Sequence, residues 1–70
     1  STETEMNAAV LKKTFRLMMI LIPRVSKLDL ETWASGTLIG AAHRALNHSS
    51  SGMRMAAVLL IVEMSTRLDE

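Results

Sequence analysis

One uninterrupted apolar run constrains the fold of this chain more than any other feature. It comprises the eight residues 55–62, and no charged side chain lies between Arg54 and Glu63. In a helix, the run would place apolar side chains on every side, so the rest of the chain or a partner has to cover more than one face. It is far shorter than the roughly 20 residues that cross a bilayer, so we expect no membrane segment. Because a short chain needs an apolar element at its centre, we interpret the run chiefly as core.

Composition limits how such a chain can be stabilised. A chain of 70 residues buries only about 60% of the surface that its unfolded form exposes. It contains no cysteine, which excludes disulfides and thiolate metal sites and favours an intracellular location, in the cytoplasm or the nucleus. Aromatic residues make up 3% of the chain, so we expect an aliphatic and methionine core around Phe15 and Trp33, with an interface as the alternative place for Trp33. Since the chain begins at Ser1, we interpret residues 1–70 as a single helical domain excised from a longer protein.

Helical periodicity predicts an all-α fold, a small compact bundle of three main helices. The first helix is expected over Glu3–Ile22. Thr2 and Glu5 have the spacing of a capping box at its start, and Pro23 ends it.

The second helical segment is the least regular of the three. Either Ser26 or Asp29 can cap its start, and it extends to about residue 47. Gly36 weakens its middle, because glycine costs a helix about 1 kcal/mol relative to alanine. A break here would let Gly36 end one helix and Thr37 cap the next, which would give four or five helices in place of three.

The third helix carries the apolar run. We expect it to begin at Gly52 or Met53, after an N-cap at Ser51, and to end at residue 68. Glu63 precedes Arg67 by four residues, which is the favourable order for an ion pair on a helix surface.

No catalytic or metal-binding signature is visible in the sequence, so we expect a protein that is not an enzyme and holds no metal or cofactor. His43 and His48 are five residues apart, which places them about 140° apart around a helix rather than on one face. We interpret both as residues near the C-terminal end of the second segment. Gly36 and Gly40 have the spacing that lets helices approach closely. We interpret them locally, as a crossing inside the bundle or the end of a helix.

The clearest functional signal is a cluster of basic residues. No acidic residue lies between Glu5 and Asp29, and this interval holds five cationic side chains: Lys12, Lys13, Arg16, Arg24 and Lys27. They can form a solvated face that keeps an apolar helix soluble. The sharper hypothesis is a docking patch for an acidic or amphipathic segment of a protein partner, because local charge steers association even in a chain of net charge +1.

Two other partners are weighed against this one. A homodimer is the alternative, because the first and third helices both have wider apolar arcs than a three-helix monomer needs. Direct binding of nucleic acid ranks lower, because the basic patch lacks interleaved aromatic residues and any known base-reading module.

A helical, cysteine-free domain with one basic face resembles the C-terminal nucleocapsid-binding domains of negative-strand RNA virus phosphoproteins. The resemblance is architectural and rests on the five basic residues flanking apolar helices. No family motif aligns with the chain, so no functional residue carries over. The resemblance implies a domain at the end of a disordered polymerase cofactor, with a nucleoprotein as the partner.

Overall fold

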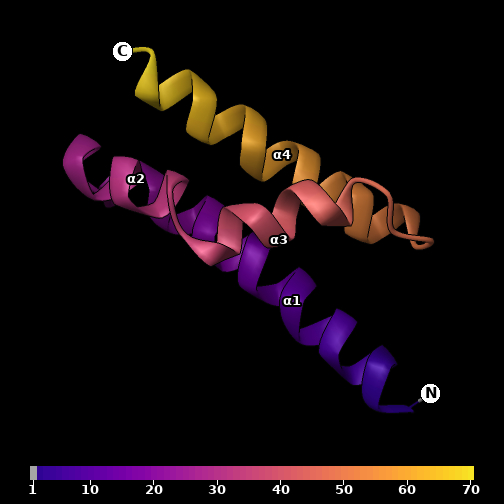
Figure 1. Cartoon of the computed structure of the whole chain (residues 1–70). Helices are drawn as coiled ribbons and strands as arrows, with labels where there is room; N and C mark the ends of the chain where they lie inside the picture. The colour runs from indigo at the N-terminus through magenta and orange to yellow at the C-terminus, as the bar shows by residue number, and fades with distance from the viewer. Residues whose placement is uncertain (1) are drawn as a thin grey trace.

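Four α-helices and one short 3-10 helix form the fold in residues 2–70, the part of the chain that the computed structural model describes; side chains are described from Asn7 onward. The elements are α1 (Thr2–Leu21), η1 (Ile22–Arg24), α2 (Lys27–Ala34), α3 (Thr37–Ala45) and α4 (Ser51–Leu68). No strand occurs among these residues. The all-α prediction is confirmed, and the second segment is broken into two helices near Gly36 (Figure 1).

The two long helices, α1 and α4, begin at the same end of the molecule and run toward the other end, where α2 lies (Figure 1). Helix α4 contacts each of the other three α-helices, so it is the element that the fold is built around. The molecule is elongated, with principal extents of 40 × 19 × 16 Å. Within the part of the chain that the structure describes, no helix combines the length and the apolar content that a membrane crossing requires.

Local sequence explains how α1 ends and how α2 begins. Pro23 lies in the first turn of η1, where its missing N–H costs no helical hydrogen bond, and Ile22 is buried beside it. The Ser26 hydroxyl then accepts a hydrogen bond of 3.2 Å from the backbone N–H of Asp29. Of the two predicted caps for the second segment, Ser26 is therefore the one in use. The predicted capping box at Thr2 and Glu5 lies outside the described side chains.

Gly36 forms the junction between α2 and α3. Its N–H donates to the carbonyl oxygen of Trp33 at 3.0 Å, and its extended backbone serves as the N-cap of α3 without a side-chain hydrogen bond. Thr37 is the first helical residue, so the prediction that it caps α3 was wrong. Gly40 lies inside α3, and a Cβ atom there would meet only the Arg44 guanidinium, at 3.5 Å, among the described neighbouring atoms. Gly36 therefore marks a helix end, and Gly40 is not a point of close contact with another helix among the described residues.

Helix α4 begins at Ser51, one or two residues earlier than predicted. Ser50 is its N-cap, and its hydroxyl accepts a hydrogen bond of 3.3 Å from the N–H of Met53. The preceding loop is held by its own polar contacts: the Ser50 N–H donates to Nδ1 of His48 at 2.9 Å, and Arg54 donates to the carbonyl oxygen of His48 at 2.6 Å. These contacts place Ser50 in the capping position, so the predicted cap Ser51 is the first residue of the helix.

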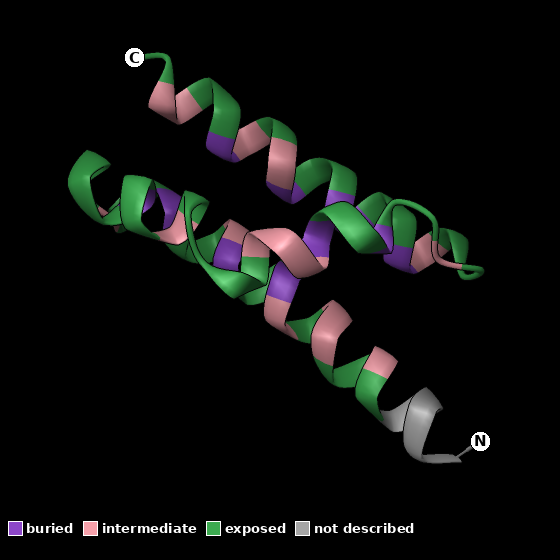
Figure 2. Cartoon of the chain, viewed as in Figure 1, coloured by how far each residue is buried: buried purple, intermediate pink, exposed green. Residues whose placement is uncertain are grey.

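The core lies along one side of α4 (Figure 2). Its fully buried large side chains are Phe15, Ile22, Met53 and Leu60, and smaller residues of α3 and α4 fill the space between them. Trp33 is half-buried and packs against this cluster. The prediction of an aliphatic and methionine core is confirmed around Phe15, whereas Trp33 lies at the edge of this core and not at its centre.

The interpretation of the apolar run as chiefly core was wrong for half of its residues. Ala56, Ala57 and Leu60 are buried and Ile61 is half-buried. The other four side chains are exposed by 40 to 58%: Met55, Val58, Leu59 and Val62. The buried residues of α4 recur at the helical period, so the packing partners of α4 cover a single side of it. The opposite side of α4 is left apolar and open.

Candidate interaction surface

An open groove of about 370 Å³ lies between α1 and the first half of α4. Three residues of α1 and four of α4 line it: Arg16, Met19, Ile20, Gly52, Met55, Ala56 and Leu59. Arg16 and Ile20 are four residues apart and therefore share one side of α1. On α4, Gly52 and Ala56 have small side chains that leave room for the groove, and the larger Leu59 lines it farther along the helix. The groove is apolar except for Arg16.

The two cations nearest to the groove lie toward the N-terminal end of α4. A Cβ atom on Gly52 would fall 2.5 Å from the ammonium nitrogen of Lys12, so Lys12 lies directly over the first turn of α4. Arg16 follows one helical turn later, on the same side of α1. The first turn of α4 adds its own partial positive charge. This end of the groove is therefore suited to a carboxylate.

The structure divides the five basic residues that the sequence singled out. Lys12 and Arg16 lie at the groove, whereas Lys13 is exposed and about 100° away from Lys12 around α1. Arg24 belongs to η1 and Lys27 begins α2, both exposed and both beyond the end of α1. The last residue of α1 is about 13 Å along the helix from Lys12. The cluster is thus a pair at the groove, Lys13 on another side of α1, and a second pair past Pro23.

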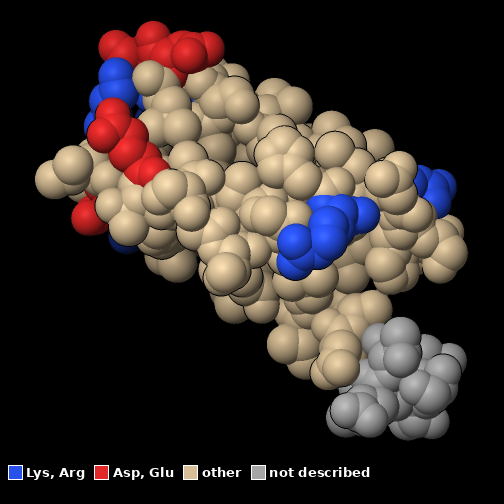
Figure 3. Space-filling model, viewed as in Figure 1, with Lys and Arg blue, Asp and Glu red and all other residues tan. Residues whose placement is uncertain are grey.

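Acidic side chains gather at the opposite end of the molecule, near the C-terminus (Figure 3). Among the described side chains they belong to α2 and to the last part of the chain: Asp29, Glu31, Glu63, Asp69 and Glu70. Glu63 follows Leu59 by four residues and so continues the line of α4 residues that border the groove. The groove and its continuation along α4 therefore have a basic residue, Arg16, near one end and an acidic residue, Glu63, near the other.

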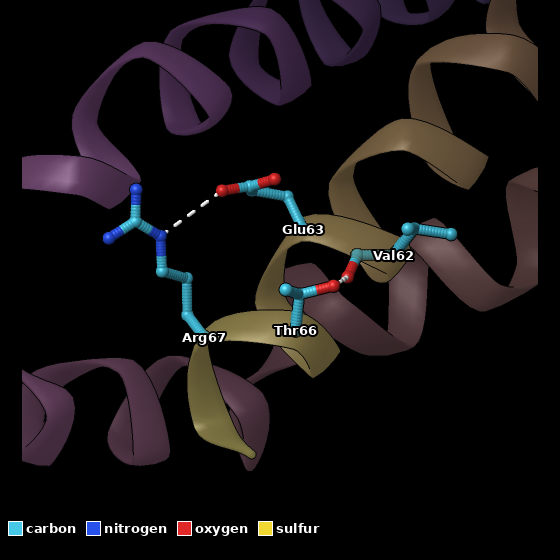
Figure 4. A network of polar contacts seen from close by, with 4 residues as sticks. All are labelled: Val62, Glu63, Thr66 and Arg67. Carbon is cyan, nitrogen blue, oxygen red and sulfur yellow. Dashed lines mark hydrogen bonds and ion pairs between the residues drawn. The ribbon is translucent and has the colours of Figure 1, made fainter. Parts of the chain in front are cut away.

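Glu63 also forms the predicted ion pair on α4. Its Oε1 atom lies 3.2 Å from Nε of Arg67, and Figure 4 shows the two side chains pointing toward each other. Nearby, the Thr66 hydroxyl donates to the carbonyl oxygen of Val62 at 2.8 Å. This is the one ion pair formed among the side chains of residues 7–70, so Lys12 and Arg16 have no acidic neighbour there within 4.0 Å.

Exposed apolar side chains extend the groove into a wider surface. We define the outer face of α4 as Met55, Val58, Leu59 and Val62, which project within about 100° of one another around the helix. Ile20, which is 66% exposed, adjoins this face across the groove. The sequence indicated surplus apolar surface on the first and third helices but did not place it, because the run contains no polar residue that would mark a solvent side.

The two histidines lie at the end of α3 and in the loop that follows it. His43 lies in the last turn of α3. His48 accepts the Ser50 N–H described above and so orders the loop before α4. Within the described residues, no group of three potential metal ligands comes together.

Comparison of the chain with protein-family models, with curated proteins and with solved structures found no match.

Proposed function

We propose that this chain is a non-enzymatic interaction domain whose α1–α4 groove binds a short amphipathic, acidic segment of another protein. The observation that supports the proposal is the combination of an open apolar groove with two cations, Lys12 and Arg16, at one end. An apolar helix face laid into such a groove supplies affinity through i, i+3 and i+4 anchors. Carboxylates at one end of the segment would meet the two cations and fix its direction.

The resemblance to phosphoprotein domains makes a segment of a nucleoprotein the partner of interest within this proposal. Direct binding of nucleic acid is supported less well. The two cations at the groove are accompanied by exposed apolar side chains, whereas nucleic-acid surfaces combine a larger basic area with stacking aromatic residues.

The proposal predicts charge-dependent binding of a model peptide. The probe is a helical peptide of about four turns, with leucines on one face and three glutamates at one end. We expect its amide NMR perturbations to centre on Met19, Ile20, Met55 and Leu59. The double substitution Lys12→Glu and Arg16→Glu should weaken binding at least about tenfold and remove most of its salt dependence.

The matched control is the double substitution Arg24→Glu and Lys27→Glu, which changes charge equally but lies beyond the end of α1. It should retain most of the affinity. Equal losses in the two double variants would favour the undivided basic patch over the groove. Unchanged binding by the Lys12 and Arg16 variant would refute the proposal.

A further inference from the structure

The outer face of α4 is self-complementary. Met55 and Val62 lie at its two ends, and Val58 and Leu59 lie at its middle. A two-fold axis between residues 58 and 59 exchanges Met55 with Val62 and Val58 with Leu59. The spacing of three, four and seven residues is that of a helix seam that packs on another helix. An antiparallel second copy therefore brings the four side chains of each face into register.

We propose that the outer face of α4 binds a second copy of this chain, with the two α4 helices antiparallel. The interface is isologous, so each copy uses the same four α4 residues together with Ile20 of α1.

The charges beside the outer face of α4 favour an antiparallel second copy over a parallel copy or an acidic segment. Arg16 borders the groove near one end of the face, and Glu63 continues the same line near the other end. An antiparallel copy places Arg16 against Glu63 of the partner subunit, twice in each dimer, whereas a parallel copy places like charges together. Glu63 uses Oε1 for Arg67, which leaves Oε2 for this contact. A uniformly acidic segment would suit Arg16 and be repelled by Glu63.

The small area of the outer face of α4 indicates a weak dimer. Standard interfaces bury about 800 Å² on each partner, which would be about one sixth of the 4837 Å² accessible surface of this chain. Helix α4 has 18 residues and a length of about 27 Å, so one helix face with its α1 border reaches at most the lower end of the standard range. We expect a dissociation constant in the micromolar range.

Self-association is tested first by mass. Sedimentation of the whole chain from about 5 μM to about 1 mM, a range that brackets micromolar affinity, should show the mass rising from monomer toward dimer. Val62→Asp should weaken the dimer at least tenfold. The matched control is Leu17→Asp, which alters a side chain of α1 that is 59% exposed but lies outside the groove and the outer face of α4. A constant monomer mass at every concentration overturns the inference of a dimer. In that case, binding of the acidic peptide would still support the proposed function, because the two experiments are independent.

The antiparallel arrangement has its own test, because the chain contains no cysteine of its own. Met55→Cys and Val62→Cys variants are mixed and oxidised. Positions 55 and 62 are separated by about 10 Å along the helix. An antiparallel pair of helices therefore brings position 55 of one copy next to position 62 of the other, and it keeps like positions too far apart for a disulfide. Mixed disulfides in excess over both homodisulfides support the antiparallel dimer, and an excess of homodisulfides overturns it.

The charge pairing is tested by exchange. Arg16→Glu and Glu63→Arg each oppose like charges in their own homodimers. A heterodimer of the two variants instead has two attractive pairs, one of the wild-type sign and one of reversed sign. We expect the mixture to dimerise at least tenfold more tightly than either variant alone. Equal dimerisation in all three samples would refute the Arg16–Glu63 contact.

Discussion

Leu59 and Leu60 are adjacent in the chain and have opposite surroundings. Leu60 is fully buried among the core residues, whereas Leu59 is 49% exposed at the edge of the groove. One position along a helix turns a side chain by about 100°, which is enough to carry it from the core to the surface. The sequence predicts that at least one of the two is buried but does not distinguish them, because both lie in a run without a polar residue.

This difference predicts unequal effects on stability. Leu60→Ala should lower the free energy of unfolding by about 2–5 kcal/mol, because it leaves a cavity in the core. Leu59→Ala should lower it by about 0.5 kcal/mol or less, as most surface substitutions do. Urea titrations at low protein concentration, where the monomer prevails, measure both values. Similar losses at the two positions would contradict the burial pattern.

At the scale of the element, helix bounds were predicted more closely than caps. Ser26 was one of two caps predicted for the second segment, whereas the caps predicted at Thr37 and Ser51 were wrong. The first helix was expected over Glu3–Ile22 and occupies Thr2–Leu21, and the last was expected to end where it does. Periodicity and Pro23 are local signals, so they locate helices well. The choice among the serines before α4 depends instead on His48 and Arg54, whose contacts with the loop are not visible in the capping pattern.

The capping geometry predicts a difference between two neighbouring serines. Ser50→Ala removes the hydroxyl that accepts the Met53 N–H and should cost about 1 kcal/mol of stability. Ser51→Ala changes the first helical residue, where alanine is well tolerated, and should be nearly neutral. Thermal unfolding followed by circular dichroism compares the two. A larger loss in the Ser51 variant would reassign the cap.

At the scale of the whole molecule, the fold class followed from the sequence and the placement of the surface did not. Helical spacing predicted an all-α bundle of three main helices, and the weak point at Gly36 left open a break in the second segment. The sequence also drew attention to Lys12 and Arg16, though as part of a longer basic cluster. The groove depends on which side of α4 its packing partners cover, a property of tertiary packing that periodicity cannot supply when a helix is apolar all round.

If the outer face of α4 binds a second copy, thermal stability should depend on protein concentration. A ligand at ten times its dissociation constant stabilises a fold by about 1.4 kcal/mol, and each kcal/mol raises the Tm of a domain of this size by about 4–8 °C. Calorimetric scans of the whole chain over a hundredfold range of concentration should show that rise. The Val62→Asp variant should have a Tm that does not change with concentration. A wild-type Tm that stays constant would argue against self-association.

The position of the single tryptophan gives the molecule a built-in spectroscopic reporter. Trp33 of α2 is half-buried and lines a hollow together with Met18 of α1 and Leu38 of α3. That hollow has no residue in common with the groove. Its indole emission should therefore shift when the helices separate, because the ring then passes into water. The groove itself is lined by aliphatic, methionine and arginine side chains. Fluorescence of this chain consequently reports folding separately from occupancy of the groove.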